Sequence, residues 1–292
     1  MKNLINYYYN LEIQNFKKSS NKFLFKLNNK NYEFVAFSGN MNELISNYNI
    51  VKSSNKYCHT IVPNKDNSPI TFYKGTQYIL IEKNLNIEKY VDSKEILFYE
   101  IIVEKNLKNN WKKLWGEKID YYEYQMSQLS IKYPLIKESL NYYIGLTETA
   151  ITLLNYVNYS MVKNYICHKR INFKEKLDEF LNPINFIIDS RVRDLAEFIK
   201  INYMFNCINY NDIIKMIELF NLSDQEAILL LSRLLYPSYY FDLYDKIIKD
   251  EIDENSIEIY TKKSTSYEVL LKKIYKTLKK IHVIPNIEWL NS

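Results

Sequence analysis

The sequence contains few of the residues that build phosphate-binding loops, metal sites and disulfides. Its 292 residues include only 4 glycines, 3 cysteines and 3 histidines. The cysteines Cys58, Cys167 and Cys207 lie far apart and form no C-x-x-C pair. We therefore expect neither a disulfide framework nor a zinc site.

Long apolar segments are absent as well. No run approaches the roughly 18 apolar residues that a membrane span needs. The N-terminal stretch "MKNLINYYYNLEIQNFKK" has neither the apolar core nor the small-residue cleavage site of a leader. We expect a soluble protein that spans no membrane and is synthesised in the cytoplasm.

No charge of one sign dominates any part of the chain. The 39 basic and 34 acidic side chains give a net charge of +5 and are mixed along the whole sequence. Because there is no basic arm, nucleic acid is not predicted as a partner. Hydrophobic residues make up 47% of the chain, which is enough to build a sizeable core.

The first 84 residues have the pattern of a small antiparallel sheet. Two stretches, "NKFLFKLNNKNYEFVAF" and "PITFYKGTQYILIE", are rich in aromatic and β-branched residues. Asn28-Asn29 and Lys74-Gly75 interrupt them as turn signals, so each stretch predicts a β-hairpin.

One short helix is expected between the two hairpins. Leu44, Ile45 and Tyr48 have helical spacing, and Asn40 or Asn42 can cap the first turn.

After residue 85 the apolar pattern becomes helical. Two capping boxes, Ser223-x-x-Glu226 and Thr265-x-x-Glu268, predict helix starts, and the second helix is expected to run until Pro285. Apolar stripes at helical spacing support two further helices: Leu140, Ile144, Thr147, Ile151 and Leu154, and Leu195, Phe198, Ile199 and Tyr203. The change predicts an α+β fold, with a β domain at residues 1–84, a helical domain at 85–292 and a connection through 83–90.

This layout resembles that of protein kinases and aminoglycoside phosphotransferases. The stretches "NYYIGLTETAITLL", "ICHKR" and "NFIIDSRVRDLAEFIK" are similar to the helix before a catalytic loop, the loop itself and the metal-binding strand with its helix. Four stretches, "WKKLWGEKIDYYEYQ", "YYIGLTETAI", "RVRDLAEFIK" and "IPNIEWL", follow one another as in the spore-coat kinase-like proteins of the CotS and YutH group. The resemblance implies a bilobal, protein-kinase-like fold over nearly the whole chain.

The catalytic loop that this resemblance implies is degenerate. In the pattern H-G-D-x-x-x-x-N, the Asp accepts a proton from the substrate and the Asn holds magnesium. Here His168 keeps the histidine, Lys169 replaces the glycine, Arg170 replaces the base and Glu175 falls at the asparagine. An arginine cannot serve as a base because its pKa exceeds about 12. We therefore expect no catalytic residue in this loop.

The next motif keeps one acid at the metal position. Asp189 matches the metal-binding Asp of the family, and Asp194 matches the structural Asp that leads the next helix, only five residues later. Asp189, with Glu175, is the residual candidate for a metal site. The alternative is that Asp189, Arg191, Arg193 and Asp194 form a partly buried ion network, in which Asp194 and Arg193 are structural.

The nucleotide-binding parts are depleted too. In "YEFVAFSG", Phe37 and Ser38 stand where the resemblance predicts a phosphate-pairing lysine, and Glu43 has lost that ion-pair partner. No glycine precedes Gly39, so no glycine loop can approach a phosphate.

The altered motifs predict a non-catalytic kinase-like protein, a pseudokinase, and the resemblance implies that it belongs to the bacterial endospore coat or its assembly. Spore-coat proteins are the expected partners, and the expected route leads from the mother-cell cytoplasm to the coat. No cofactor is expected, and the oligomeric state is left open. Two alternatives remain: a divergent small-molecule phosphotransferase that uses ATP and magnesium, and a regulator that binds a nucleotide without turning it over.

Overall fold

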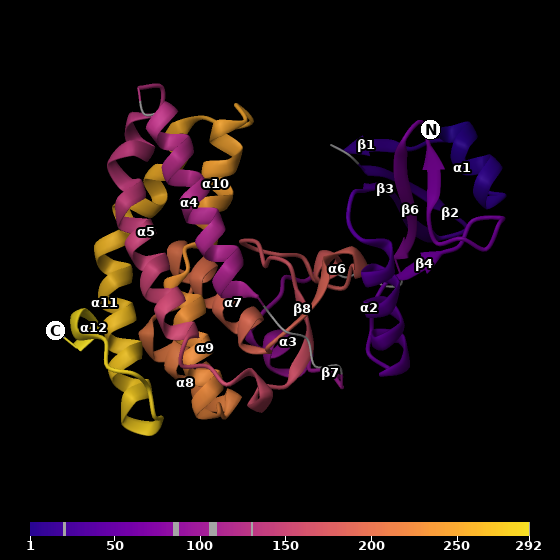
Figure 1. Ribbon diagram of the computed structural model, residues 1–292. Coiled ribbons are helices and arrows are strands. Elements are labelled where there is room, and N and C mark those ends of the chain that lie inside the picture. The colour runs from indigo at the N-terminus through magenta and orange to yellow at the C-terminus, as the bar shows by residue number, and fades with distance from the viewer. Residues whose placement is uncertain (20–21, 84–87, 105–109, 130, 292) are drawn as a thin grey trace. The chain divides into compact units, whose positions relative to one another are not determined.

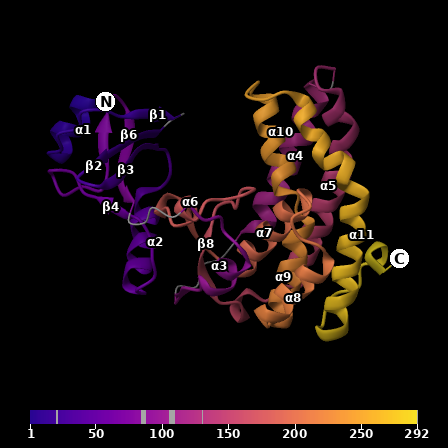
Figure 2. The ribbon, with the colours of Figure 1, turned by 180° about the vertical axis from the view of Figure 1, so that it is seen from behind.

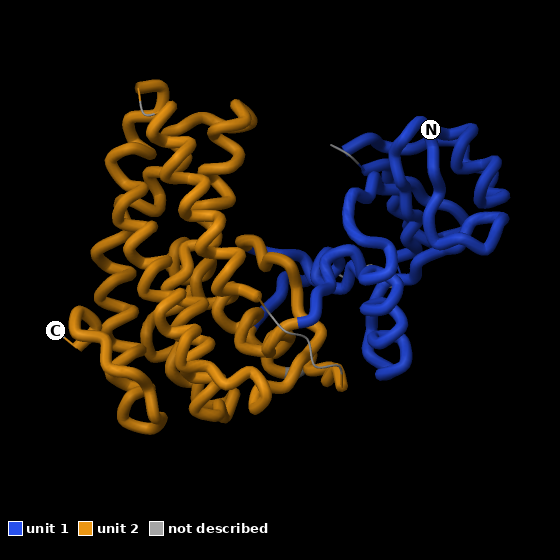
Figure 3. Tube along the Cα trace, viewed as in Figure 1, with its two compact units in different colours: residues 1–92, 174–188 blue, residues 93–173, 189–292 orange. Residues whose placement is uncertain are grey.

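The computed structural model describes residues 1–292 except 20–21, 84–87, 105–109, 130 and 292. The chain forms two compact units, drawn in blue and orange in Figure 3. Unit 1 contains Met1–Asp92 and Lys174–Ile188, and unit 2 contains Ser93–Phe173 and Asp189–Ser292. The predicted boundary between residues 84 and 85 lies outside the described residues. Within the described part, no helix combines the length and apolarity needed to cross a bilayer.

Unit 1 is an antiparallel sheet with strand order β1-β2-β3-β6-β4, and β5 pairs with β6. Its strands are β1 (Lys17–Ser19), β2 (Lys22–Leu27), β3 (Lys30–Phe37), β4 (Thr60–Val62), β5 (Thr71–Tyr73) and β6 (Thr76–Lys83). Its helical elements are α1 (Lys2–Tyr9), α2 (Met41–Ser53), α6 (Leu177–Phe180) and the 3₁₀ turn η2 (Pro183–Asn185). The predicted sheet with a helix between its hairpins is confirmed.

Two-residue turns join the strands of each hairpin. The β2–β3 turn is Asn28-Asn29, with φ of 49° and 63°, and the β5–β6 turn is Lys74-Gly75, with φ of 48° and 78°. Positive φ at both turn residues is the geometry that matches the twist of paired strands. Asn and Gly adopt it readily, so these local signals predicted the hairpins correctly.

Each face of this sheet has an apolar cluster. On one face, Phe34 of β3 and Leu80 of β6 pack with Ile5 and Tyr9 of α1, a helix that the sequence analysis did not predict. On the other face lies a second set, which includes Leu44 of α2. The Asn40 side chain accepts hydrogen bonds from the Asn42 and Glu43 amides, so Asn40, rather than Asn42, is the N-cap of α2.

Unit 2 is mostly helical. Its helices are α3 (Ser93–Phe98), α4 (Trp111–Leu129), α5 (Pro134–Leu154), α7 (Val192–Met204), α8 (Tyr210–Phe220), α9 (Asp224–Leu235), α10 (Ser238–Ile248), α11 (Glu258–Ile281) and α12 (Glu288–Asn291), with 3₁₀ turns η1 (Tyr159–Met161) and η3 (Glu254–Ile257). Strands β7 (Ile102–Val103) and β8 (Asn164–His168) pair antiparallel, and β9 (Phe186–Asp189) contains the unit boundary. In Figures 1 and 2, α4, α5 and α10 run side by side.

Tyrosines hold α10 against its neighbours. Tyr240 of α10 stacks on Tyr143 of α5 with 3.8 Å between ring centroids, and its hydroxyl lies 2.8 Å from the Ser139 hydroxyl. From α4, the Tyr122 hydroxyl donates to the Asp245 carboxylate at 2.8 Å. Aromatic pairs of this kind contribute beyond their buried area. These contacts hold α10 in a position where its Asp242 contacts Arg170, in the loop after β8.

The two predicted helix starts have different outcomes. The Ser223–Glu226 box is present at the start of α9, where each side chain bonds the backbone amide of the other. The prediction that Thr265–Glu268 starts a helix is wrong, because α11 already begins at Glu258. This helix ends at Ile281, before Pro285. Inside a helix, Ser and Thr hydroxyls donate to carbonyls of the preceding turn, as Ser264 does to Thr261. The Thr-x-x-Glu spacing of Thr265 and Glu268 therefore occurs within α11 without marking a helix start.

We predict that Ser223→Ala lowers the free energy of unfolding by about 1 kcal/mol, because the Glu226 amide in the first turn of α9 loses its hydrogen-bond partner. Thr265→Ala is the matched control, and we expect it to leave stability unchanged or slightly higher, since alanine is the better helix former. Urea unfolding followed by circular dichroism measures both. A larger loss in Thr265→Ala than in Ser223→Ala would contradict the assignment.

Candidate functional site

The loop after β8 begins at a buried histidine. His168 ends β8 and is 1% exposed, and Asp194 lies in the first turn of α7. The Asp194 carboxylate accepts from the His168 backbone amide at 2.9 Å and lies 2.6 Å from His168 Nδ1. Both carboxylate oxygens of Asp194 are thus engaged by one residue, and this contact joins the end of β8 to the start of α7.

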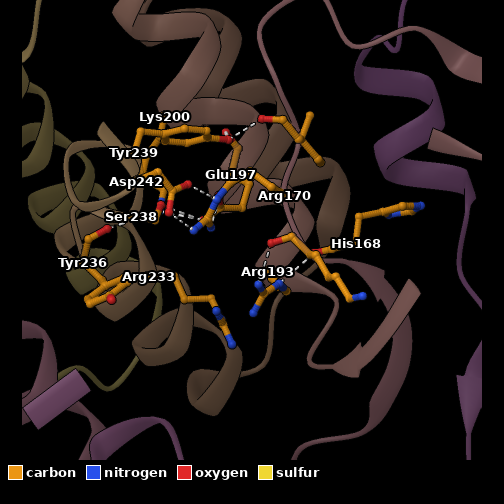
Figure 4. Close-up of polar contacts among 12 residues, drawn as sticks. His168, Arg170, Arg193, Glu197, Lys200, Arg233, Tyr236, Ser238, Tyr239 and Asp242 are labelled. Carbon is orange, nitrogen blue, oxygen red and sulfur yellow. Dashed lines mark hydrogen bonds and ion pairs between the residues drawn. The ribbon is translucent and has the colours of Figure 1, made fainter. Parts of the chain in front are cut away.

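Arg193 makes a second connection between the same elements. Its Nε donates to the His168 carbonyl and its Nη2 to the Lys169 carbonyl, both at 2.8 Å (Figure 4). Its Nη1 donates to the Asp189 carboxylate at 3.1 Å. Arg193 is 7% exposed, so the His168 and Lys169 carbonyls are bound by a buried side chain.

Arg170, the residue at the base position, is held by two carboxylates. Its Nε and Nη2 donate to the Asp242 carboxylate at 2.6 and 3.0 Å, and its Nη1 donates to Glu197 at 2.8 Å (Figure 4). Burial opposes the charge, yet Glu197 and Asp242 raise the pKa of Arg170 above its ordinary value. A planar guanidinium with two-point binding to one carboxylate is a strong and geometrically specific pair.

Glu197 connects this pair to a buried lysine. Its carboxylate accepts from Lys200 at 2.7 Å and from the Ser238 hydroxyl at 3.0 Å. Burial lowers the pKa of Lys200 to about 8, although Glu197 opposes that change. Burial likewise works against the charge on Glu197, but Lys200 and Arg170 hold its pKa below the ordinary value. The acid therefore stays ionised between two cations.

Asp189, the candidate metal ligand, is bound by arginines. Its Oδ2 accepts from Arg193 at 3.1 Å and also from Arg233, and its Oδ1 accepts from the Ser190 amide at 2.7 Å. Among the residues that the structure describes, no three His, Cys, Asp or Glu side chains gather into a group that could hold a metal ion. Glu175, its proposed co-ligand, belongs to unit 1. The metal role of Asp189 stays a prediction.

The lysine position of β3 is apolar in the structure. Phe37 is 7% exposed and packs in the cluster that contains Leu44 of α2, whereas Ser38 and Glu43 are exposed. A Cβ atom on Gly39 would come within 2.7 Å of the Phe37 ring, so a larger residue at position 39 would force that ring to shift. Packing of an aromatic ring therefore joins β3 to α2 where the family pattern has an ion pair.

Unit 1 also contains an ion cluster that the sequence analysis missed. Glu33 of β3 is 0% exposed, 3.0 Å from the Lys22 ammonium and 3.4 Å from that of Lys83. Lys22 also pairs with Glu179 of α6 at 3.0 Å, and Lys83 pairs with Asp178. Burial opposes the charge on both lysines, but these acids hold the pKa of each above its ordinary value. The cluster fastens α6 to β2, β3 and β6.

Backbone contacts strengthen the same attachment. The Leu177 amide donates to the Lys89 carbonyl at 2.8 Å, and the His59 amide donates to the Leu181 carbonyl at 3.0 Å. The His59 ring lies 2.7 Å from the Asp178 carbonyl. The segment that follows the degenerate loop is thus an integral part of unit 1.

A family model described as "Spore coat putative kinase YutH" matches residues 2–274. The chain belongs to this family. It is 31% identical over 153 residues to the endospore coat-associated protein YutH of Bacillus subtilis strain 168, a match that covers 46% of this chain and 45% of that relative. The matched stretch thus spans less than half of the relative's length. The predicted resemblance to the CotS and YutH group is confirmed.

Solved structures of phosphotransferases have the same fold. The aminoglycoside phosphotransferase of Alicyclobacillus acidocaldarius has a TM-score of 0.67 at 10% identity and covers 96% of this chain and 97% of its own. A spectinomycin phosphotransferase in complex with ADP and spectinomycin has a TM-score of 0.62 at 13% identity, over 94% and 97% of the two chains. The predicted α+β, protein-kinase-like fold of this YutH-family chain is therefore confirmed.

Some partners in this YutH-family site were predictable from the sequence and others were not. Glu197 and Lys200 are spaced i, i+3 in α7, a pattern that predicts the side-chain pair they form. Asp242 and Arg233 lie on other helices, and nothing in their local sequence indicates a role in this site.

We predict that Asp194→Ala lowers the free energy of unfolding by about 2–4 kcal/mol, because a buried amide and a buried imidazole lose their partner. Asp224→Ala is the matched control. Asp224 pairs with His282 at 3.0 Å with its side chain 47% exposed, so we expect a loss below about 1 kcal/mol. Guanidinium unfolding measures both variants. A loss below about 0.5 kcal/mol in Asp194→Ala would contradict the buried tie between β8 and α7.

Proposed function

We propose that this protein is a non-catalytic, kinase-like component of the bacterial endospore coat or of its assembly. The observation that carries the proposal is the state of Arg170. A cation stands at the base position, and Asp242 and Glu197 hold it through three hydrogen bonds. A guanidinium cannot accept the proton that the attacking hydroxyl must lose.

Two further contacts support the loss of phosphoryl transfer. The Asp189 carboxylate is shared by two guanidinium groups, so a divalent cation would have to displace them. Phe37 fills the lysine position with an apolar ring. Phosphoryl transfer depends on positioning and on neutralising charge with metal and lysine together. The base position, the metal position and the lysine position, occupied by Arg170, an arginine-bound Asp189 and Phe37, therefore all lack the groups that phosphoryl transfer requires.

The coat assignment follows from the family. The family description names the spore coat, and the relative in Bacillus subtilis is described as endospore coat-associated. We propose that spore-coat proteins are the partners of this chain and that it needs no cofactor. The mixed surface charge, with a net of +5, favours protein partners over nucleic acid.

We predict that neither the wild type nor Arg170→Asp shows magnesium-dependent ATP hydrolysis or transfer above background. Restoring one acid does not restore the lysine, the glycine loop or a metal-binding carboxylate. ATP with magnesium should leave the melting temperature unchanged, whereas a ligand at about 100 times its Kd would add about 2.7 kcal/mol of stability. Radiolabelled turnover and thermal shift measure the two effects.

Isothermal titration of ATP, with and without magnesium, tests the alternative role of a nucleotide-binding regulator, and the turnover assay tests that of a phosphotransferase. A low-micromolar Kd that weakens at least tenfold in Arg170→Ala would make Arg170 a phosphate ligand and the protein a nucleotide-binding regulator. Turnover by the wild type would make it a divergent phosphotransferase.

Location is tested separately in the organism. We expect a fluorescent fusion, produced in the mother cell, to gather around the developing spore. A fusion that stays dispersed in the mother cell through coat formation would contradict the coat assignment but would not bear on the kinase-like fold.

A further inference from the structure

The end of α11 and the neighbouring helix α8 enclose an apolar groove with a volume of about 230 Å³. Its apolar walls include Ile214, Ile217, Leu278 and Ile281. Ile281, Leu219 of α8 and Val283, which follows α11, are 66%, 70% and 79% exposed. Exposed apolar side chains gathered around a groove are typical of interaction surfaces.

The stretch of α11 that forms one wall of this groove is strongly basic. From residue 269 to residue 287 the sequence has five lysines and no acid: Lys272, Lys273, Lys276, Lys279 and Lys280. Three acids lie nearby. Glu218 lines the groove, Asp224 pairs with His282 at 3.0 Å and Glu268 pairs with Lys272 at 3.1 Å. The lysines outnumber these acids, so an acidic partner is favoured. We call this region the basic groove.

The segment before α11 has the opposite charge. Residues 249–258, which we call the acidic end, contain one lysine, Lys249, and five acids: Asp250, Glu251, Asp253, Glu254 and Glu258. Asp250 pairs with Lys132, and Glu258 pairs with Lys262. The five acids still exceed these three lysines by two. Glu251 is exposed and Ile252 is partly exposed, so the acidic end also presents an apolar side chain.

The two charged regions lie at opposite ends of one helix. Helix α11 has 24 residues, which is about 36 Å at 1.5 Å per residue. In Figures 1 and 2 it runs along one side of unit 2, from the end near α10 to the end near α8. The acidic end therefore cannot reach the basic groove of its own chain. A second copy of the chain can supply it.

We propose that the acidic end of one copy binds in the basic groove of a second copy, so that the chains associate head to tail. Ile252 enters the apolar groove, and Glu251 with its neighbouring acids faces the lysines of α11. Because the two surfaces differ, each contact leaves one surface of each kind free, and further copies can add unless the arrangement closes into a ring. This inference goes beyond the non-catalytic role and does not depend on whether the chain binds ATP.

Sedimentation velocity of the full chain tests the proposal. At about 100 µM protein and about 10 mM salt, where charges are weakly screened, we expect a mean mass at least twice the 35.2 kDa of one chain. At about 0.5 M salt the mass should fall toward that of one chain, because screening weakens the contact. A chain that stays monomeric at low salt overturns the proposal, and so does association that salt leaves unchanged.

Two variants each alter one of the surfaces. Glu251→Gln combined with Glu258→Gln removes two charges from the acidic end, and Ile281→Glu places an acid in the basic groove. Each variant should be monomeric at low salt, because complementary charge is lost or like charges meet. Leu114→Glu is the matched control. Leu114 is 51% exposed on α4, so the same kind of change should leave association intact. Association that either surface variant leaves unchanged overturns the proposal.

A mixture of the two surface variants shows whether the two regions bind each other. The acidic-end variant keeps its groove, and the Ile281→Glu variant keeps its acidic end. An equal mixture should therefore form a one-to-one dimer that does not grow, because both remaining surfaces are altered. Recovery of association would also show that both variants are folded. A mixture that stays monomeric overturns the head-to-tail contact.

Discussion

The first two turns of α7 carry the buried charges on which the site in unit 2 depends. Asp194 binds both the amide and the ring of His168, and Arg193 binds the carbonyls of His168 and Lys169. Glu197, one turn later, binds Arg170. One helix thus fixes the backbone and the charged side chain of the degenerate loop. Because α7 is buried continuously from Val192 to Ile201, it cannot shift without disturbing the core around it.

Burial makes each of these charges depend on its partner. Moving an ion into the interior costs several kcal/mol, and only a well-placed opposite charge offsets that cost. Glu197 satisfies this condition with Arg170 and Lys200, and Asp189 does so with Arg193 and Arg233. A working metal site keeps its carboxylates available for a cation that arrives later. In this chain the charges that neutralise Asp189 and Glu197 are side chains of the polypeptide itself.

Local sequence signals predicted the features that local physics decides. The turns at Asn28-Asn29 and Lys74-Gly75 and the Ser223 box each depend on a few adjacent residues. The helix α1 was missed because it has no side-chain cap and only two of its residues, Ile5 and Tyr9, are buried against the sheet. The Thr265 box failed because the same spacing occurs inside α11. The partners Asp242 of Arg170 and Arg233 of Asp189 could not be predicted, since each pair forms only when distant helices pack.

The surroundings of Phe37 and Arg170 limit which residues these two positions can hold. Phe37 packs in one cluster with Leu44 of α2, and its ring would have to shift if position 39 held a residue larger than glycine. A lysine at position 37 would place a charge in an apolar cluster. Likewise, an acid at position 170 would face the Asp242 and Glu197 carboxylates, and only Glu197 would keep a cationic partner, Lys200. The contacts of Phe37 and Arg170 thus favour the residues that stand there over the lysine and the acid of the phosphotransferase pattern.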